Sequence, residues 1–353
     1  MRTHHNPYTA VRRSLLSLAV AAVCCSGAAY AQDEDSAAAK EEGAAQLDVV
    51  TVTAQRRVEN VNEVPISITT IADEKLDVIG SGGDDIRVLS GRLPSLNIES
   101  SFGRAFPRFY IRGLGNTDFD LNASQPVSLV YDDIVQENPL LKGFPIFDLD
   151  SVKMLRGPQG TLFGRNTPAG VLKFQSRRPT QETEGYAQVS YGALGNANFE
   201  GAYGGGLNDA WSMRASALYQ RRDDWVDNTQ TSGDDELEGY KEFAARVQVL
   251  YAPSDDTEAL FNIHARSLDG TARLFRANII QHGSNDLIPG FDRESISIDG
   301  TNLQELDTFG ANARLRFDLG RVTLFSVSGY ESADSLSRGD IDGGYGASFA
   351  PPF

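Results

Sequence analysis

The chain has 353 residues, with 48 acidic against 32 basic side chains and a formal net charge of −16. This acidic balance argues against a nucleic-acid-binding protein, which needs a basic face. With only two cysteines and four histidines, the chain has few residues for disulfides, thiol chemistry or a zinc site.

The N-terminus, residues 1–31, has the pattern of a secretory signal peptide. Arginines precede an apolar stretch at residues 14–25 that is too short to span a bilayer, and an Ala-Tyr-Ala cleavage site ends at Ala31. The alternative is a lipoprotein anchor at Cys24, but the residues before this cysteine lack the leucine and the small final residue of a lipobox. We therefore predict secretion and a mature chain that begins after residue 31.

Removal of this segment sharpens the composition. It takes away both cysteines, two histidines and three arginines, which leaves 29 basic against 48 acidic residues and a net charge of −19. The remaining histidines, His264 and His282, have no metal-site or catalytic pattern around them, and no nucleophile–base pair or cofactor loop is found. We predict no enzyme activity, no metal and no cofactor. Since no later apolar run reaches about 18 residues, any membrane crossing must use strands.

A polar, acidic leader follows at residues 32–46, whose composition cannot bury a core and predicts disorder. It runs into a β-branched strip with high strand propensity and no partner strand nearby in the sequence. An extended strip after a flexible leader suits β-strand addition to the sheet edge of another protein. The residues predicted to make this contact are Leu47, Asp48, Val49, Val50, Thr51, Val52 and Thr53, in a strip that ends at Ala54.

Residues 58–180 mix strand and helix signals and predict a small α+β domain, large enough at roughly 120 residues for a modest core. The expected elements are strands at 67–71, 108–113 and 127–131, a short helix at 84–89, and a helical turn at 148–152 leading into a strand at 153–155.

The most informative stretch, residues 156–174, reads RGPQGTLFGRNTPAGVLKF. Its four glycines and two prolines predict several sharp turns before a strand. A phosphate-binding loop is excluded because Gly164 is followed by Arg165 and Asn166 instead of Lys and Ser or Thr.

This stretch resembles the plug-domain signature of TonB-dependent outer-membrane receptors, and the strip at 47–54 resembles their TonB box. The resemblance implies that residues 58–180 form a plug inside a barrel and that the leader, residues 32–57, carries the contact with a periplasmic TonB protein. It also implies that Arg112 and Arg156 are plug arginines that pair with barrel glutamates, as an arginine in a partly dry lumen requires.

Two plug loops, at residues 101–107 and 116–124, are the candidates for substrate contact. Their aromatic and cationic side chains suit a ferric chelate or another bulky anionic ligand. The alternative, that they pack against the barrel wall, stays open. The candidate residues are Phe102, Arg104, Phe106 and Phe119.

Residues 181–353 alternate apolar and polar side chains in seven strands of about ten residues, which is typical of a transmembrane barrel. A soluble β-sandwich would alternate too, but short and long connections also alternate, with long ones at 222–241 and 268–308. A plugged transporter of this family needs 22 strands, so we expect the N-terminal part of a larger barrel. The seven strands are expected at about 186–193, 198–206, 211–221, 242–252, 257–267, 309–319 and 322–331.

The predicted fold is therefore an α+β plug domain followed by antiparallel transmembrane β-barrel strands, in the outer membrane of a Gram-negative bacterium with the plug and TonB box on the periplasmic side. By resemblance, the function is TonB-dependent binding and import of a scarce solute, most often a ferric siderophore in this family. The expected partners are TonB, outer-membrane lipid and this solute. Two alternatives remain: a truncated, non-transporting product that folds only its plug, and a receptor for carbohydrate or another metal chelate.

Overall fold

The computed structural model describes residues 51–52, 59–60, 66–80, 82, 85–118, 120, 122–231, 236–271 and 273–346. These residues belong to one compact unit, Val50–Phe353. The predicted signal peptide, most of the leader and Phe119 lie outside the described residues. Of the strip at 47–54 only β1 (Thr51–Val52) is described, and it pairs antiparallel with β2 (Glu59–Asn60), so this part of the strip has a partner strand in its own chain.

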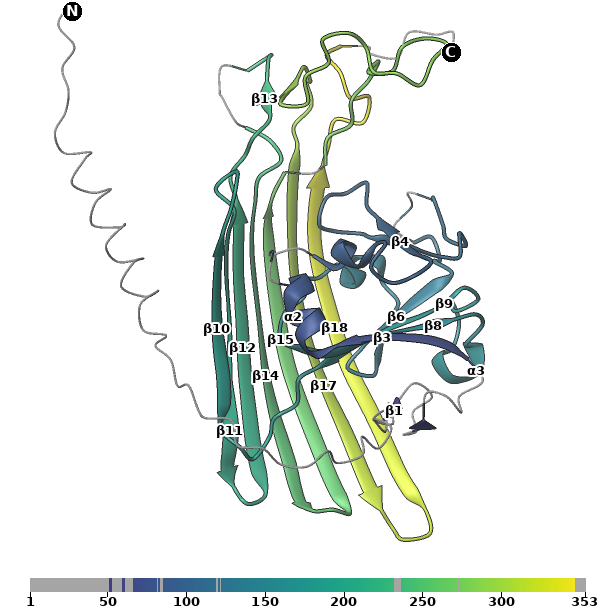
Figure 1. Ribbon diagram of the computed structural model, residues 1–353, viewed down its shortest axis with the longest axis vertical. Helices are drawn as coiled ribbons and strands as arrows, with labels where there is room; N and C mark the ends of the chain where they lie inside the picture. Colours follow the sequence, from purple (N-terminus) through teal and green to yellow (C-terminus); the bar gives the residue numbers. More distant parts are fainter. Residues whose placement is uncertain are drawn as a thin grey trace, which may run out of the picture. The chain divides into compact units, whose positions relative to one another are not determined.

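The largest element is a seven-stranded antiparallel sheet in which each strand pairs with the next one along the chain (Figure 1). All seven predicted strands are present, joined by tight connections at one end and, at the other, by the short connection 192–196 and two long ones. They are β10 (Glu184–Tyr191), β11 (Ala197–Asn208), β12 (Trp211–Arg222), β14 (Tyr240–Ser254), β15 (Thr257–Gly270), β17 (Leu303–Asp318) and β18 (Thr323–Arg338).

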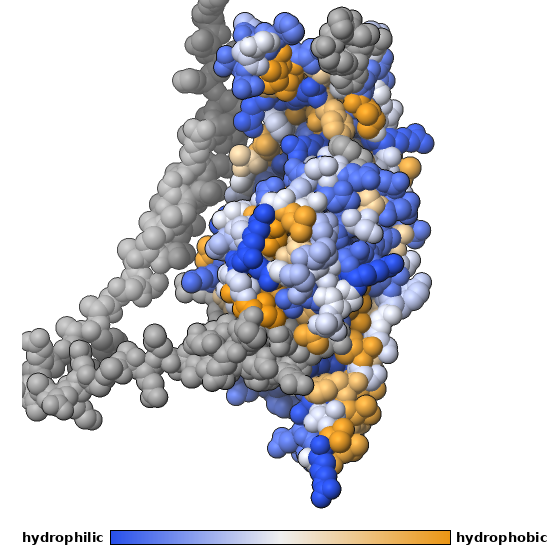
Figure 2. Space-filling view, turned by 90° about the vertical axis from the view of Figure 1, so that its right-hand side faces the viewer, coloured by the Kyte–Doolittle hydropathy of each residue, from blue (hydrophilic) through white to orange (hydrophobic). Residues whose placement is uncertain are grey.

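The sheet carries apolar side chains on its outer face and polar ones on its inner face. Phe243 and Ile263 are exposed, whereas Arg246 and Asn262, on the same two strands, are buried against the smaller domain. This is the reverse of a water-soluble sheet and fits an outer face in lipid. On the side from which the smaller domain projects, hydrophilic surface predominates, and apolar residues gather mainly toward the end with the tight turns (Figure 2).

The smaller α+β domain lies against the inner face of this sheet (Figure 1). Its five-stranded sheet has the order β3-β8-β9-β6-β7, in which β6 and β9 are parallel and the other pairs antiparallel. Leu129, Val152, Met154, Leu172 and Phe174 form the centre of its core. The strands are β3 (Ser67–Ala72), β6 (Val127–Tyr131), β7 (Ile134–Gln136), β8 (Leu149–Arg156) and β9 (Gly170–Ser176), with a separate hairpin of β4 (Leu96–Glu99) and β5 (Arg108–Ile111).

In its described residues, this domain also has four short helices: α2 (Asp73–Gly80), η1 (Ile86–Leu89), η2 (Pro139–Lys142) and α3 (Gly160–Phe163). The predicted helix at 84–89 corresponds to η1, whose N-cap Asp85 accepts from the backbone N–H of Arg87 at 3.0 Å. The predicted helical turn at 148–152 is wrong, because β8 already begins at Leu149 and Asp148 has a positive φ of 46°. Among the described residues, no helix is long and apolar enough to cross a membrane.

The glycine-rich stretch folds as predicted, into turns that lead to a strand. Its last glycine, Gly170, has φ +150°, and a Cβ there would overlap the carbonyl oxygen of Leu155 and come within 2.9 Å of Cδ1 of Ile111. Only glycine allows β8 and β9 to approach so closely at this point.

The two long connections fold together instead of lying apart. The strand β13 (Asp227–Asn228) in the first pairs in parallel with β16 (Ser295–Ile296) in the second. Val226, Leu237 and Ile298 form a small buried cluster with Ile296. The amide of Asn228 ties the two connections together, since it donates to the carbonyl of Ile298 at 3.0 Å and accepts from its N–H at 3.2 Å.

Candidate functional site

A polar cavity of about 600 Å³ lies between the α+β domain and the long-connection end of the large sheet. It is walled by the segment before and within loop 101–107, by the ends of β12, β14 and β15, and by the following connections. Four arginines and three carboxylates line it, so its walls offer both charges. The lining residues are Asp85, Arg87, Val88, Ile98, Glu99, Ser100, Gly103, Arg104, Asn196, Arg222, Glu238, Gly239, Tyr240, Leu268, Gly270, Thr271, Arg273 and Gln304.

Side chains of the large sheet and its loops hold the 101–107 loop by its backbone. Arg273 donates to the carbonyl of Ser100 at 2.9 Å, Gln304 donates to that of Phe102, and Arg266 donates to that of Arg104 at 3.3 Å. Donors thus reach alternate carbonyls along the loop, which keeps buried backbone acceptors satisfied. The floor of the cavity is therefore preformed.

Arg104, predicted to contact substrate, is buried between the plug and the large sheet. Its Nε donates to Oε2 of Glu242 at 2.6 Å and its Nη2 to Gln220 at 2.7 Å, and its guanidinium lies 4.2 Å from the ring centre of Tyr240. Burial alone would lower the pKa of Arg104, but the carboxylates of Glu242 and Asp85 together with Tyr240 outweigh burial, and the pKa is raised. Arg104 thus lines the cavity as a fixed cation whose nearest partner, Glu242, belongs to the sheet.

The other predicted substrate contacts are placed differently. Phe102 is half-buried and packs edge to face on Phe106 at 5.4 Å, and Phe106 is buried. Phe106 is therefore closed to solvent, whereas Phe102 is partly exposed. Phe119 lies outside the described residues. No ligand contact is tested for any of them, so their role stays a prediction.

Arg112 and Arg156, the plug arginines predicted to pair with barrel glutamates, have no carboxylate partner among the described residues. Arg156 donates to the hydroxyls of Ser95 and Ser67 and to the carbonyl of Pro94 at 2.8 Å, all within the α+β domain. Burial and the neighbouring Arg112 lower the pKa of Arg156. Arg112 is exposed at a positive φ of 54°. Their pairing with barrel glutamates stays a prediction about strands beyond the seven seen here.

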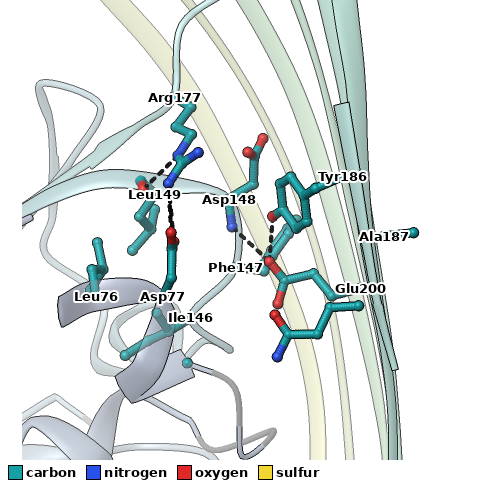
Figure 3. Close-up of a pocket in the computed structure, with 12 residues that line it drawn as sticks. Leu76, Asp77, Ile146, Phe147, Asp148, Leu149, Arg177, Tyr186, Ala187 and Glu200 are labelled. Atoms are coloured by element: carbon teal, nitrogen blue, oxygen red, sulfur yellow. Dashed lines mark hydrogen bonds and ion pairs between the residues drawn. The ribbon is translucent and has the colours of Figure 1, made fainter. Parts of the chain in front are cut away.

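A second cavity, of about 380 Å³, lies between α2 and the first two strands of the large sheet. Figure 3 shows Glu200 on β11 at its wall, where it accepts from the hydroxyl of Tyr186 and, at 3.2 Å, from the backbone N–H of Asp148. Across the cavity, Arg177 pairs with Asp77 of α2 at 3.0 Å.

Sequence reasoning missed Asp148 and Glu242, the two carboxylates at the centre of the contact between the domains. Asp148 pairs with Arg214 at 2.6 Å and with Arg246 at 3.4 Å. A signal was available, because Arg214 and Arg246 occupy inward positions of alternating strands and a buried arginine needs a carboxylate.

Comparison with known proteins identifies the family. Residues 60–171 match the family model described as the TonB-dependent receptor plug domain. The chain is 27% identical over 208 residues to the pesticin receptor of Yersinia pestis, and the match covers 59% of the chain and 30% of that receptor. The chain carries the plug domain of the TonB-dependent receptor family.

Other receptors of this family share the sequence or the fold. The vitamin B12 transporter BtuB of Photobacterium profundum is 23% identical over 206 residues, 57% of this chain and 30% of that protein. In fold, the chain resembles the ferric yersiniabactin uptake receptor of Yersinia pestis, with a TM-score of 0.66 and 22% identity over 76% of this chain and 41% of that one. The chain thus spans well under half the length of the relatives it matches.

The family match indicates in which membrane the molecule lies and which end of it faces the periplasm. TonB-dependent receptors are outer-membrane proteins of Gram-negative bacteria with the plug on the periplasmic side. The α+β domain is the plug and the seven-stranded sheet is a part of the barrel, open at β10 and β18 in the described residues. The long connections and the 600 Å³ cavity face outward, as expected when short turns are periplasmic.

Proposed function

We propose that the complete receptor binds a scarce, bulky solute at the outer cavity and imports it into the periplasm by TonB-dependent transport, and that this solute is a ferric siderophore. The observation that carries the proposal is the preformed cavity of about 600 Å³ above the plug. It lies at the only end of the sheet where, among the described residues, long connections add walls beyond the strands.

The chemistry of this cavity suits a polar chelate. Arg87, Arg222 and Arg273 line it beside the ring of Tyr240, so anionic oxygen atoms and flat aromatic groups both find partners. Glu99 and Glu238 on the same walls would receive donors of the ligand. A concave site with a few polar groups is the usual form of a small-molecule site.

The named relatives support the same class of solute. A ferrioxamine receptor of Yersinia enterocolitica is 24% identical over 115 residues, and a ferripyoverdine receptor of Pseudomonas aeruginosa is 25% identical over 181 residues. The vitamin B12 transporters among the relatives make cobalamin the rival substrate class.

Energy would come from contact with TonB, since the strip at 47–54 suits β-strand addition. In the part of the chain that the structure describes, β10 and β18 each have only one neighbouring strand. Because unpaired backbone groups in hydrocarbon cost several kcal/mol each, we propose that further strands of the complete receptor close the barrel.

The test is uptake by the complete receptor in a strain that lacks its own siderophore receptors. Radiolabelled ferric yersiniabactin, ferripyoverdine, ferrioxamine and cobalamin are supplied separately, with and without a functional TonB. We expect TonB-dependent accumulation of one of the three iron complexes. If only cobalamin accumulates, the protein is a cobalamin receptor and the siderophore proposal is wrong. Uptake of equal size with and without functional TonB would contradict the proposed transport mechanism.

A further inference from the structure

Asp148 is held by the barrel wall more extensively than any other carboxylate of the plug in the described residues. Its side chain accepts from Arg214 of β12 at 2.6 and 3.0 Å and from Arg246 of β14 at 3.4 Å. All three side chains are at least nine-tenths buried. Fully desolvated charges of this kind are costly to separate, because each would remain buried without its partner.

The backbone of the same residue adds two further contacts to the wall. Its N–H donates to Glu200 of β11 at 3.2 Å, and its carbonyl accepts from Nη2 of Arg246 at 2.7 Å. One plug residue is therefore bonded to three consecutive strands, β11, β12 and β14. A positive φ of 46° turns the chain at this point and lets side chain and backbone face the wall together, which Asp tolerates better than most residues.

The contact extends on both sides of Asp148. Arg214 also pairs with Glu184 of β10 at 2.7 Å, and Arg246 also donates to the hydroxyl of Tyr131 on β6 of the plug. Charges and hydrogen bonds thus connect β10, the first strand of the large sheet, with β6 of the plug sheet.

The position of Asp148 in the plug gives this contact a mechanical meaning. It directly precedes β8, whose six residues from Ser151 to Arg156 pair with β3. β3 is an edge strand with β8 as its only sheet neighbour in the described residues, and it is the first strand of the five-stranded plug sheet along the chain. A pull on the N-terminal segment that opens the short β1–β2 pairing therefore acts on β3 next, then on β8, and then on the wall contact of Asp148.

We propose that Asp148 is the positioning residue that anchors the plug to barrel strands β11, β12 and β14 and keeps the resting receptor closed. Release of this anchor would let the plug move away from the wall at the 380 Å³ cavity beside α2 (Figure 3). The proposal rests on the proposed transport function, since it describes how the closed state of the transporter is held.

The first experiment measures leakage through the full-length receptor, without solute and without TonB. Asp148→Asn keeps the shape of the side chain and suits the positive φ, but removes the charge. The control is Glu137→Gln, which also neutralises a plug carboxylate, because its ion pair, to Arg165 at 3.1 Å, lies within the plug and lines neither of the two cavities described above. The readouts are conductance of the purified receptor in planar bilayers and entry of a large antibiotic into TonB-deficient cells.

We expect Asp148→Asn to raise leakage by about tenfold or more, as the loss of one doubly paired buried charge permits, and Glu137→Gln to stay near the wild type. A tight Asp148→Asn receptor would overturn the anchor, and so would equal leakage from Glu137→Gln.

A second variant separates anchoring from simple neutralisation of buried arginines. In Asp148→Asn/Arg246→Gln the charge balance is restored but the contact with β14 is lost. We expect the temperature of unfolding to recover while leakage persists. If leakage returns to the wild-type level together with stability, Asp148 only neutralises charge. Neither assay uses a siderophore, so failure of the anchor and failure of the proposed import are read separately.

Discussion

Arg104 of the plug and Glu242 of the barrel form an ion pair of 2.6 Å, although 138 positions separate them in the sequence. The other oxygen of Glu242 accepts from Arg266 of β15, also at 2.6 Å. One buried carboxylate thus serves two cations, one on each side of the boundary between plug and wall.

Because Glu242 is shared by two arginines, we expect the loss of Glu242 and the loss of Arg104 to lower stability by different amounts. Arg104→Gln leaves Glu242 paired with Arg266, whereas Glu242→Gln leaves two buried arginines without a carboxylate at this position. Because an unpaired buried charge costs about 3–5 kcal/mol, we expect Glu242→Gln to lower the stability of the closed receptor by that amount and Arg104→Gln by clearly less. The temperature at which the full-length receptor loses its heat-modifiable migration measures the difference. Equal losses would show that Arg266 does not compensate.

The close approach of β8 and β9 gives a test of the glycine-rich stretch. Gly170→Ala would place a methyl group on the carbonyl of Leu155, and the backbone there cannot give way without breaking the ladder. Gly157→Ala is the matched control, since its φ is also positive, at +90°, but its surroundings are open.

We expect the control to cost about 1 kcal/mol, the ordinary price of an alanine at positive φ, and Gly170→Ala to make the plug sensitive to protease. A protease-resistant Gly170→Ala plug would contradict the packing argument.

How far the sequence predicts this molecule depends on the range of the contacts. The alternation in β14 and β15 is local and strong, and it predicted both strands and the direction of Arg246 and His264. The outer ends of β17 and β18 were missed, because residues 303–308 and 332–338 continue the pairing where apolar alternation has stopped. Helix α2 was missed because few of its residues face the core, so that it has no clear apolar stripe. Of its residues whose burial is described, only Leu76 and Gly80 are buried.

The candidate site was less accessible to sequence reasoning. The substrate contact predicted for Arg104 stays a prediction, and its pairing with Glu242 depends on the register of β14 against the plug, which no local pattern encodes. Asp148 was read as part of a helical turn because Asp commonly begins helices. Its positive φ and its contacts with Arg214 and Arg246 depend on the wall around it.

Lys142 gives the plug a predicted dependence on pH. Its ammonium is buried at the end of η2, where it donates to the carbonyl of Val127 at 3.2 Å, and burial lowers its pKa from 10.5 to about 8. Below pH 8 the lysine is charged in both states and the folded plug bears the full cost of burying the charge. As pH rises from about 8 to 10.5, the folded state loses its proton first and stability increases.

The gain is about 3 kcal/mol at most, from 1.36 kcal/mol for each pKa unit. Lys142→Met should raise stability at neutral pH and flatten the curve over this range. Protease resistance of the plug, measured between pH 7 and 10.5 for both proteins, checks the prediction. A wild-type curve that is flat or falling would show that Lys142 is charged and well solvated in the folded plug.

The coupling strip gives the last prediction. Thr51 and Val52 pair with Glu59 and Asn60 in their own chain, so strand addition to TonB would have to displace this short pairing, which two residues stabilise weakly. Val50→Pro removes a backbone donor and should prevent strand addition. We expect the full-length receptor with this change to bind its solute at the cell surface at wild-type levels and to lose energised uptake. Ala45→Pro, five residues earlier in the polar leader, is the control and should transport normally. Normal uptake by Val50→Pro would exclude the strip as the TonB contact, and loss of uptake in both variants would point to the leader as a whole.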